Sequence, residues 1–578
     1  MCLFWNGPAL PANMCNWGAL AVIQPLLERM DVAGIIDRHL PPDPQLEYSY
    51  GKVLQLLLAT RLQNPVALVN VAGWAEKSGA EIFYDVPAVK LNDDRLGRAL
   101  DALFTQRHSI LASLAEHTLR TFELPRDRLH YDTTHLLFQG SYDGSQPIDT
   151  GLSLPPLTPS QDFPPAHITH GYLDKHKMIH VGVSAVVDEL GAVPIYGHIL
   201  SGNRNGQTGI EHQFHLLQNY LHPDPFLMVS DRGTFSADHV ARLGRAGHFV
   251  LCSVPWKDYR PLFEQQRAQL HWRTASFLSV EQQRRRDTKS SLPKEHYQLA
   301  VLKHQLTDPE TKKPIRCRVL FVFSSADQKS QRANRAAAIA KIRRGLEQIQ
   351  QAVARAHPTT RLDQIPVRVA KLFGKKEAAR YFRYELVKLS DAERDALPPP
   401  QRGGRPATHR FTFTFDQQAA DADTTGDGYY ALLTTAPQTY SADTLFTFFK
   451  EQNYLESAHH QFKTPLAVTP FFLKTPERVE ALAYLMKIAL TAYHLIQRVY
   501  RQAVADEEKL PRAEKRLTTE SILRVFNLCP MQIEKRPLGK MVRVSSLTSR
   551  QRQILFRLGF DTPVQNFARR LPKPPPPD

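Results

Sequence analysis

The stretch RLHYDTTHLLFQG (128–140) alternates along its length and is rich in aromatic and β-branched residues, which predicts a β-strand. The segment KMIHVGVSAVVDELGAVPIYGHIL (177–200) predicts two further strands joined by a turn at 188–191. These three strands follow one another without an intervening helix. We therefore expect an antiparallel three-stranded unit over 128–200.

Two shorter strands are predicted downstream of this unit. FLMVS (226–230) and HFVLCSV (248–254) are apolar and short, and helical patterns at 207–221 and 236–245 precede them. Three antiparallel strands followed by parallel crossover units are the order of an RNase H-like core. The pattern thus predicts an α/β protein with an RNase H-like catalytic core.

The flanking sequence divides into further regions. Residues 1–125 carry apolar side chains at helical spacing and predict a helical N-terminal DNA-binding or assembly domain. The core is expected over 126–256 and again over 441–505, interrupted at 257–440 by strand-like segments and one long helix that predict a β-rich insertion. Residues 506–578 predict a basic C-terminal region that ends in a disordered tail, PKPPPPD.

The charge of the chain favours a polyanionic partner. The formal net charge is +16, and residues 501–578 contribute 16 Lys and Arg against 8 Asp and Glu. DNA and RNA are equally compatible with this surplus, and solubility alone is the alternative interpretation. The charge therefore indicates a class of partner without identifying it.

Other features place the chain in a reducing compartment away from the membrane. Its five cysteines are scattered without a CxxC pair, which argues against a disulfide framework or a structural zinc site. The N-terminal residues lack the pattern of a signal peptide. The apolar stretch 481–500 contains Lys487, His494 and Arg498, so we expect a core helix there. These observations predict a cytoplasmic protein.

Three acids are candidates for a catalytic metal site. Cleavage of a phosphodiester by two divalent ions needs about three carboxylates on a rigid frame. Asp132 lies in the middle of the first strand and Asp231 directly follows 226–230, where strand ends gather ligands. The alternatives are a hydrogen-bonded strand-edge Asp and a helix-capping Asp. Because the first and fourth strands of such a core are neighbours, we expect Asp132 and Asp231 to meet.

The third acid is expected from the helical segment FFKEQNYLESAHHQFK (448–463). Phe449, Gln452, Glu456 and Lys463 are spaced so that one continuous helix would present them on one face. Glu456 would then reach the metals and Lys463 a DNA phosphate. Glu451 is the rival acid, on a different face, and a solvated helix with incidental charges is the alternative.

At these residues the chain resembles the DDE insertion-sequence transposases that carry a Tyr-Arg-Glu-Lys signature, insertion-sequence family four and its sixteen-thirty-four branch. Glu456 and Lys463 match the signature, whereas Phe449 replaces its Tyr and Gln452 its Arg. The segments YDTTHLLFQG, DELGAVPI, SGNRNG, VSDRGTFS and TPFFLKTPERVEALAYLMKIAL also resemble that branch.

The resemblance implies cut-and-paste transposition of an insertion sequence, with two Mg²⁺ or Mn²⁺ ions held by Asp132, Asp231 and Glu456. It also implies that Phe449, Gln452, Lys463 and Arg232 contact DNA. The implied partners are double-stranded terminal inverted repeats and target DNA, bound by a homodimer in a bacterial, nucleoid-associated setting. Two alternatives remain open: a catalytically inactive DNA-end-binding relative, and an RNase H-like nuclease without strand transfer.

Overall fold

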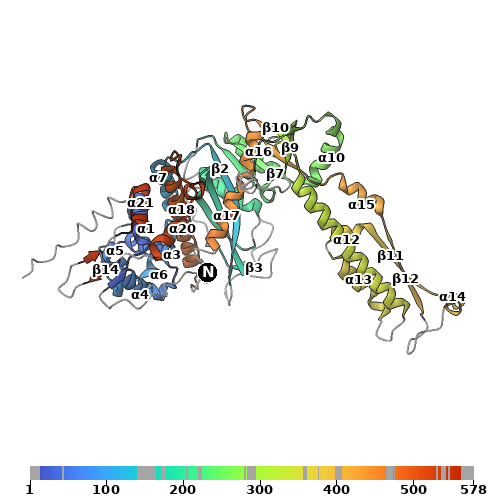
Figure 1. Cartoon of the computed structure of the whole chain (residues 1–578), viewed down its shortest axis with the longest axis horizontal. Helices are drawn as coiled ribbons and strands as arrows, with labels where there is room; N and C mark the ends of the chain where they lie inside the picture. The colour runs from blue at the N-terminus through green and yellow to red at the C-terminus, as the bar shows by residue number, and fades with distance from the viewer. Residues whose placement is uncertain are drawn as a thin grey trace, which may run out of the picture. The chain divides into compact units, whose positions relative to one another are not determined.

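The computed structural model divides the chain into two compact units (Figure 1). Unit 1 comprises Met1–Ser253, Gln305–Cys317 and Leu433–Asp578, and unit 2 comprises Val254–His304 and Arg318–Leu432. The structure describes residues 14–41, 44–138, 165–170, 177–203, 206–218, 224–278, 282, 295–355, 361–374, 376–397, 407–463, 473, 475–528, 532–535, 542–544 and 547–560. The predicted C-terminal tail lies outside these residues.

The N-terminal part of unit 1 is helical, as its apolar spacing predicts. Its helices are α1 (Leu20–Arg29), α2 (Val32–His39), α3 (Tyr50–Gln63), α4 (Val71–Ser78), α5 (Ala80–Tyr84), α6 (Asp93–Thr105) and α7 (Arg107–Thr121). Side chains that favour the N-cap position start two of them: Ser49 accepts from the Lys52 amide, and Asn92 accepts from the Arg95 amide.

A mixed sheet follows these helices. Its strands are β2 (Arg128–Phe138), β3 (Thr169–His170), β4 (Lys177–Asp188), β5 (Gly191–Ser201), β6 (Leu227–Ser230) and β7 (Phe249–Val254). β2 pairs antiparallel with β4, which pairs antiparallel with β5, while β2, β6 and β7 run parallel. The spatial order is thus β5-β4-β2-β6-β7, and unit 1 is an α/β unit with a mixed sheet.

Four helices of unit 1 accompany the sheet: α8 (Gly206–Leu216), α9 (Ala237–Arg245), α16 (Ala442–Lys450) and α17 (Gln452–Lys463). Ser441 caps α16 by accepting from the Thr444 amide. The prediction of a single helix over 448–463 is wrong, because α16 ends at Lys450 and a turn at Glu451 separates it from α17.

The core of unit 1 surrounds α18 (Pro476–Ala503), of whose 28 residues 21 are buried. This helix packs against β5, α3 and α6 (Figure 1). It is long and apolar enough to span a membrane, but its most apolar 18-residue stretch is 100% buried inside the protein. It is therefore enclosed as the core helix of a soluble protein is. The C-terminal elements β14 (Gln532–Lys535), β15 (Val542–Val544), α19 (Arg512–Lys515), α20 (Thr519–Leu528) and α21 (Ser549–Leu558) also belong to unit 1.

The N-terminal and C-terminal segments of unit 1 meet in a small sheet of their own. β1 (Met14–Asn16) pairs antiparallel with β14, which pairs with β15. Both α20 and α21 pack against α18. The C-terminal region is thus part of the same compact unit as the N-terminal helices.

Unit 2 combines strands with one long helix. Its elements are α10 (Trp256–Gln266), β8 (Arg273–Thr274), β9 (Tyr297–Thr307), β10 (Pro314–Ser324), α12 (Ser325–Ala354), α13 (Ile365–Phe373), β11 (Phe382–Lys388), α14 (Asp391–Asp395), β12 (His409–Phe415), α15 (Gln417–Thr424) and β13 (Tyr429–Thr434), of which β9, β10 and β13 extend past the boundary of the unit. The antiparallel pair β11–β12 packs with α12 and α13 around a core that includes Leu346, Val369 and Phe411.

A buried ion pair joins α7 to α18. Arg107 Nε lies 2.7 Å from Glu480 Oε1, and the two side chains are 2% and 3% exposed. Glu480→Gln is expected to lower the free energy of unfolding by about 3–5 kcal/mol, because the guanidinium would stay buried without a counter-charge. Urea unfolding followed by tryptophan fluorescence measures this. Asp94→Asn, which breaks the exposed Arg98–Asp94 pair, is the matched control; an equal loss in both variants would contradict the prediction.

Burial also makes unit 1 sensitive to acid. It lowers the pKa of His494, on α18, from about 6.5 to about 3. The unfolded chain takes up this proton below about pH 6.5 and the folded chain does not, so stability present above pH 6.5 is lost as the pH falls toward 3. The loss amounts to at most about 1.4 kcal/mol per pH unit. Urea unfolding between about pH 7 and pH 5 should therefore show a shallower pH dependence for His494→Gln than for the wild type; identical slopes would rule out this contribution.

Candidate functional site

The sheet places two of the candidate acids next to each other. β2 and β6 are parallel, and Tyr131 pairs with Ser230. Asp132 and Asp231 are the next residues along these two chains, and Asp231 keeps an extended backbone (φ −87°, ψ 172°). Neighbouring strands lie about 4.8 Å apart. Two carboxylates far apart in the sequence therefore occupy adjacent positions at the carboxyl end of β6.

Asp132 is already engaged by groups of unit 1. Its Oδ2 lies 3.3 Å from His459 Nδ1 on α17, and its Oδ1 accepts from the Thr133 amide at 2.7 Å. The side chain of Asp132 is 27% exposed and that of His459 is 9% exposed. Asp132 is thus a partly buried carboxylate with an imidazole beside it, and one side open to solvent.

Asp231 lies at the start of a short 3₁₀ helix, η4 (Arg232–Thr234), and is exposed. Its side chain makes no capping hydrogen bond to this helix. The helix-capping alternative considered for this residue is therefore not what the structure shows.

A buried amide fixes the position of α17 on the sheet. Gln452 is 6% exposed, its Nε2 donates to the Tyr131 carbonyl at 3.0 Å, and its Oε1 lies 2.9 Å from His130 Nδ1. Burial lowers the pKa of His130 to about 3, so the ring is neutral and its Nδ1–H donates to Gln452. Both functional groups of this amide are used to hold α17 against β2.

Glu456 lies on the same face of α17 as these contacts. Gln452, Glu456, His459 and Lys463 follow at spacings of four, three and four residues, which places them on one helical face. Gln452 contacts the carbonyl of Tyr131 and His459 contacts Asp132, while Glu456 between them is exposed. The third candidate acid therefore comes from the helix face that packs on β2.

Lys463 brings a cation to the same region. Desolvation lowers the pKa of Lys463, and the charge of Asp132 opposes that shift. Lys463 is the last residue of α17 and is exposed. The amine is therefore close enough to Asp132 to interact with it and remains open to an external anion.

The three acids share a region without forming a ready ligand set. Within the residues that the structure describes, no three His, Cys, Asp or Glu side chains lie close enough together to hold a metal ion. The chemistry of Asp132, Asp231 and Glu456 suits a hard divalent cation, and their backbone positions suit a shared site. Their side chains would have to turn toward one another, and Asp132 would have to leave His459, to bind one ion together.

The structure changes the interpretation of two predicted DNA contacts. Gln452 is buried and hydrogen-bonded to β2, so its amide is not available to contact DNA. The expectation that Gln452 contacts DNA is therefore wrong. Phe449 is half-buried on α16, and the turn at Glu451 removes it from the helix that carries Glu456. Lys463 and Arg232 are exposed, which leaves them open to a phosphate.

Two residues near the site take roles that the sequence did not indicate. Glu451 pairs with Arg128 at 3.0 Å, and the Arg128 guanidinium lies 3.6 Å from the centre of the Phe448 ring. Burial raises the pKa of Glu451 to about 7. His459, three residues after Glu456, contacts Asp132. The three-residue spacing to Glu456 was the one available signal for His459.

Comparison with known proteins identifies one part of unit 1. Residues 13–115 match a family described as a domain of unknown function, DUF4277. This match covers the N-terminal helices and ends before β2. No curated protein matches the chain.

The burial of Gln452 predicts the effect of restoring the arginine of the Tyr-Arg-Glu-Lys signature. Gln452→Arg places a guanidinium at a 6% exposed position beside the neutral His130 ring, and removes the amide oxygen that accepts from it. We expect a lower melting temperature, corresponding to about 1–3 kcal/mol or more for the unpaired buried groups. Asn453→Arg, at the exposed neighbour, is the control for added charge; equal melting temperatures of the two variants would show that Gln452 does not fasten α17.

Proposed function

We propose that this chain is a DDE-type DNA transposase whose catalytic acids are Asp132, Asp231 and Glu456. The observation that carries the proposal is the β2–β6 register, which makes Asp132 and Asp231 neighbours. The packing of α17 on β2 adds Glu456 from a third segment. Two-metal phosphodiester cleavage needs about three carboxylates on a rigid frame, and these three come from distant parts of the sequence.

The strand order supports an RNase H-like core in unit 1. Such a core needs three antiparallel strands with the first strand beside a parallel fourth, and the order β5-β4-β2-β6-β7 meets this requirement. The helices α8 and α9 occupy the crossovers before β6 and β7. The fold proposal and the site proposal thus rest on the same central strand, β2.

The residues of the site would have three different roles in the proposed reaction. Asp132, Asp231 and Glu456 would hold two Mg²⁺ or Mn²⁺ ions, which when bound activate the attacking oxygen and stabilise the leaving oxygen. Lys463 and Arg232 would contact phosphates beside the scissile bond. His459 would release Asp132 to the cation, and Gln452 would keep α17 in register with β2.

The partners follow from the proposed reaction. We propose that the chain acts on double-stranded DNA, at terminal inverted repeats and at a target site, as a homodimer in the bacterial nucleoid. Inverted repeats that bracket the gene would be an independent sign of this function.

A second candidate is a DNA-end-binding relative that has lost catalysis. The contact between His459 and Asp132, together with the buried glutamine at the arginine position of the signature, favours it. This candidate predicts binding to the DNA ends without Mg²⁺-dependent nicking. An RNase H-like nuclease would nick but would not join ends to a supercoiled target.

The proposed roles predict a specific pattern of activity. Asp132→Ala, Asp231→Ala and Glu456→Ala are each expected to abolish Mg²⁺-dependent nicking of a plasmid that carries the flanking DNA of the gene. DNA binding should stay equal or tighten, because a negative charge beside a phosphate is removed. Glu451→Gln is the control, since its side chain pairs with Arg128 instead. Nicking at the wild-type rate by Asp132→Ala would exclude Asp132 as a catalytic residue.

A further inference from the structure

The net charge of the chain is concentrated in unit 2. Unit 2 contains 30 of the 73 Lys and Arg and 17 of the 57 Asp and Glu, which gives it a formal charge of +13. Unit 1 contains the remaining 43 Lys and Arg against 40 Asp and Glu, a charge of +3. Unit 2 is the smaller unit, so its charge density is far higher than that of the unit with the candidate catalytic acids.

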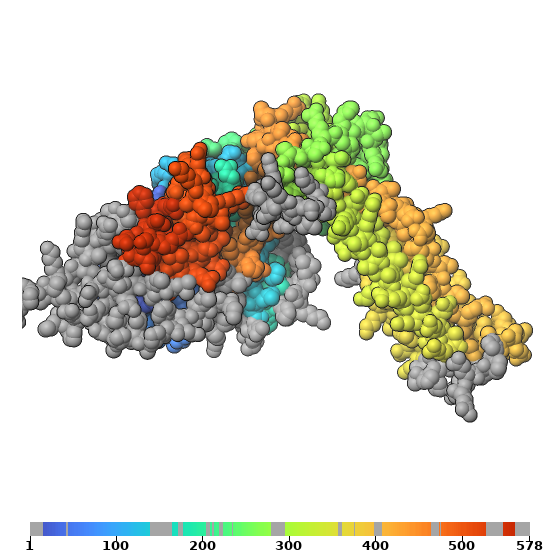
Figure 2. Space-filling view, in the orientation of Figure 1, coloured from blue at the N-terminus to red at the C-terminus, as the bar shows by residue number. Residues whose placement is uncertain are grey.

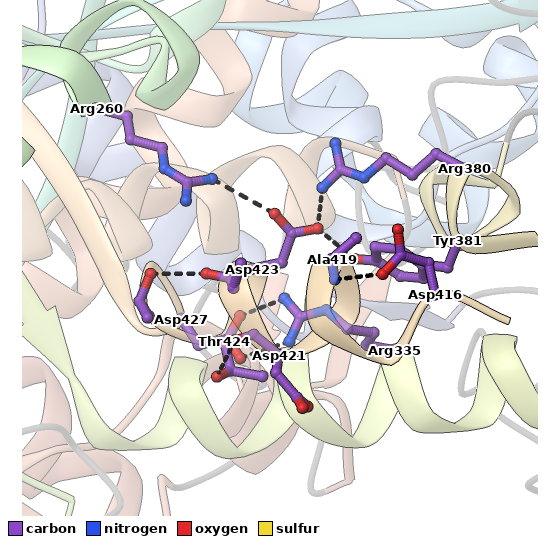
Figure 3. A network of polar contacts seen from close by, with 12 residues as sticks. Arg260, Arg335, Arg380, Tyr381, Asp416, Ala419, Asp421, Asp423, Thr424 and Asp427 are labelled. Atoms are coloured by element: carbon purple, nitrogen blue, oxygen red, sulfur yellow. Dashed lines mark hydrogen bonds and ion pairs between the residues drawn. The ribbon is translucent and has the colours of Figure 1, made fainter.

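Two aspartates of unit 2 form ion pairs with arginines of α12 and of the segments beside it (Figure 3). Asp427, 2% exposed, accepts from Arg335 Nη1 at 2.7 Å and lies 3.6 Å from Arg332 Nε. Asp423 pairs with Arg380, accepts from the Tyr381 hydroxyl, and lies 3.6 Å from Arg260. These carboxylates therefore compensate cations inside unit 2 and leave others without a counter-charge.

The outer face of α12 carries three cations without a counter-charge among the residues that the structure describes. Ile342, Leu346 and Ile349 of α12 point into the core of unit 2. Lys329, Lys341 and Arg344 lie on the opposite side of the helix by its 3.6-residue period and are exposed. None of the three forms an ion pair with any residue that the structure describes, and Glu347 is the one acid of this helix beyond its first turn. Figure 2 shows α12, in yellow-green, on the surface of unit 2.

We infer that the outer face of α12 binds the sugar-phosphate backbone of double-stranded DNA without reading its sequence. Lys329 and Arg344 are fifteen residues apart, which spans about 22 Å of helix, or roughly six base pairs of duplex. Lysine and arginine at such intervals contact phosphates and position a duplex. The identification of the polyanion as DNA rests on the proposed function; the location of the surface rests on the charges of unit 2.

The test measures binding of the full chain to a fluorescent duplex of arbitrary sequence, in EDTA, by anisotropy over a range of salt concentrations. Lys329→Gln/Lys341→Gln/Arg344→Gln should weaken binding at about 100 mM salt by at least tenfold. The slope of log K against log salt should become less negative by about 2 to 3, because three phosphate contacts are lost. An unchanged slope and affinity would overturn the inference.

Two control variants separate this surface from charge in general. Lys329→Arg/Lys341→Arg/Arg344→Lys keeps the charge and should bind as the wild type does. Lys312→Gln/Lys313→Gln/Arg316→Gln removes the same charge from exposed positions of unit 1, outside its predicted DNA-binding helices and its candidate site, and should change the slope by much less. An equal loss in this second control would show that net charge, rather than the α12 face, determines binding and would overturn the assignment.

Further measurements on the same proteins identify the occupant and keep the two proposals apart. Tighter binding to duplex RNA than to duplex DNA, or to vesicles with anionic headgroups, would replace DNA as the partner and contradict the inference as stated. If the wild type shows no Mg²⁺-dependent nicking but its DNA binding still depends on the α12 cations, the transposase proposal is refuted and the DNA-binding surface is supported. If the wild type nicks DNA but its DNA binding does not depend on these cations, the transposase proposal is supported and the DNA-binding surface on α12 is refuted.

Discussion

The burial of charged side chains along α18 is the constraint on which unit 1 depends. Three ionisable residues of this helix are nearly or fully buried, and each has a partner outside the helix. Glu480 pairs with Arg107 of α7, while Lys487 donates to the Gly182 carbonyl and Arg498 lies 2.7 Å from Asp188, both on β4. A buried charge without its partner costs several kcal/mol. A shift of α18 by one residue would separate all three pairs, so their geometry fixes the register of this helix against the N-terminal helices and the sheet.

The position of α18 also affects the candidate site, because α18 contacts β4 and β4 pairs with β2. Because β4 is held by Lys487 and Arg498 and pairs with β2 from His130 to Phe138, the position of Asp132 depends on contacts made by α18. On its other side β2 pairs with β6, which sets Asp231 beside Asp132. Gln452 then adds α17 by hydrogen bonds to the same two residues of β2 that precede Asp132. The site is thus assembled from backbone pairing and one buried amide, while its acids remain open to solvent.

The sequence predicted what periodicity and strand order determine. The strands β2, β4, β5, β6 and β7, the helices α8 and α9 and the adjacency of Asp132 and Asp231 follow from local pattern and from the pairing rules of such sheets. It did not predict the turn at Glu451, because the spacing from Phe449 to Lys463 suits one helix; Glu451 at this turn pairs with Arg128, far away in the sequence. For the same reason the burial of Gln452 and the contact of His459 with Asp132 were not foreseen, since both depend on the strand that α17 packs against.

The distribution of charge between the units agrees with a buried glutamine at position 452, where the Tyr-Arg-Glu-Lys signature has an arginine. A guanidinium at position 452 would be desolvated next to a neutral histidine, so the buried amide is the more stable choice for joining α17 to β2. A glutamine offers no positive charge to a phosphate, and Lys463 and Arg232 are the predicted DNA contacts that are exposed. Affinity for a polyanion must then come from other cations, and unit 2 holds +13 of the net +16. A near-neutral unit with the candidate acids and a strongly basic unit without them is the arrangement expected when the chemistry and the bulk of DNA affinity are carried by separate parts of one chain.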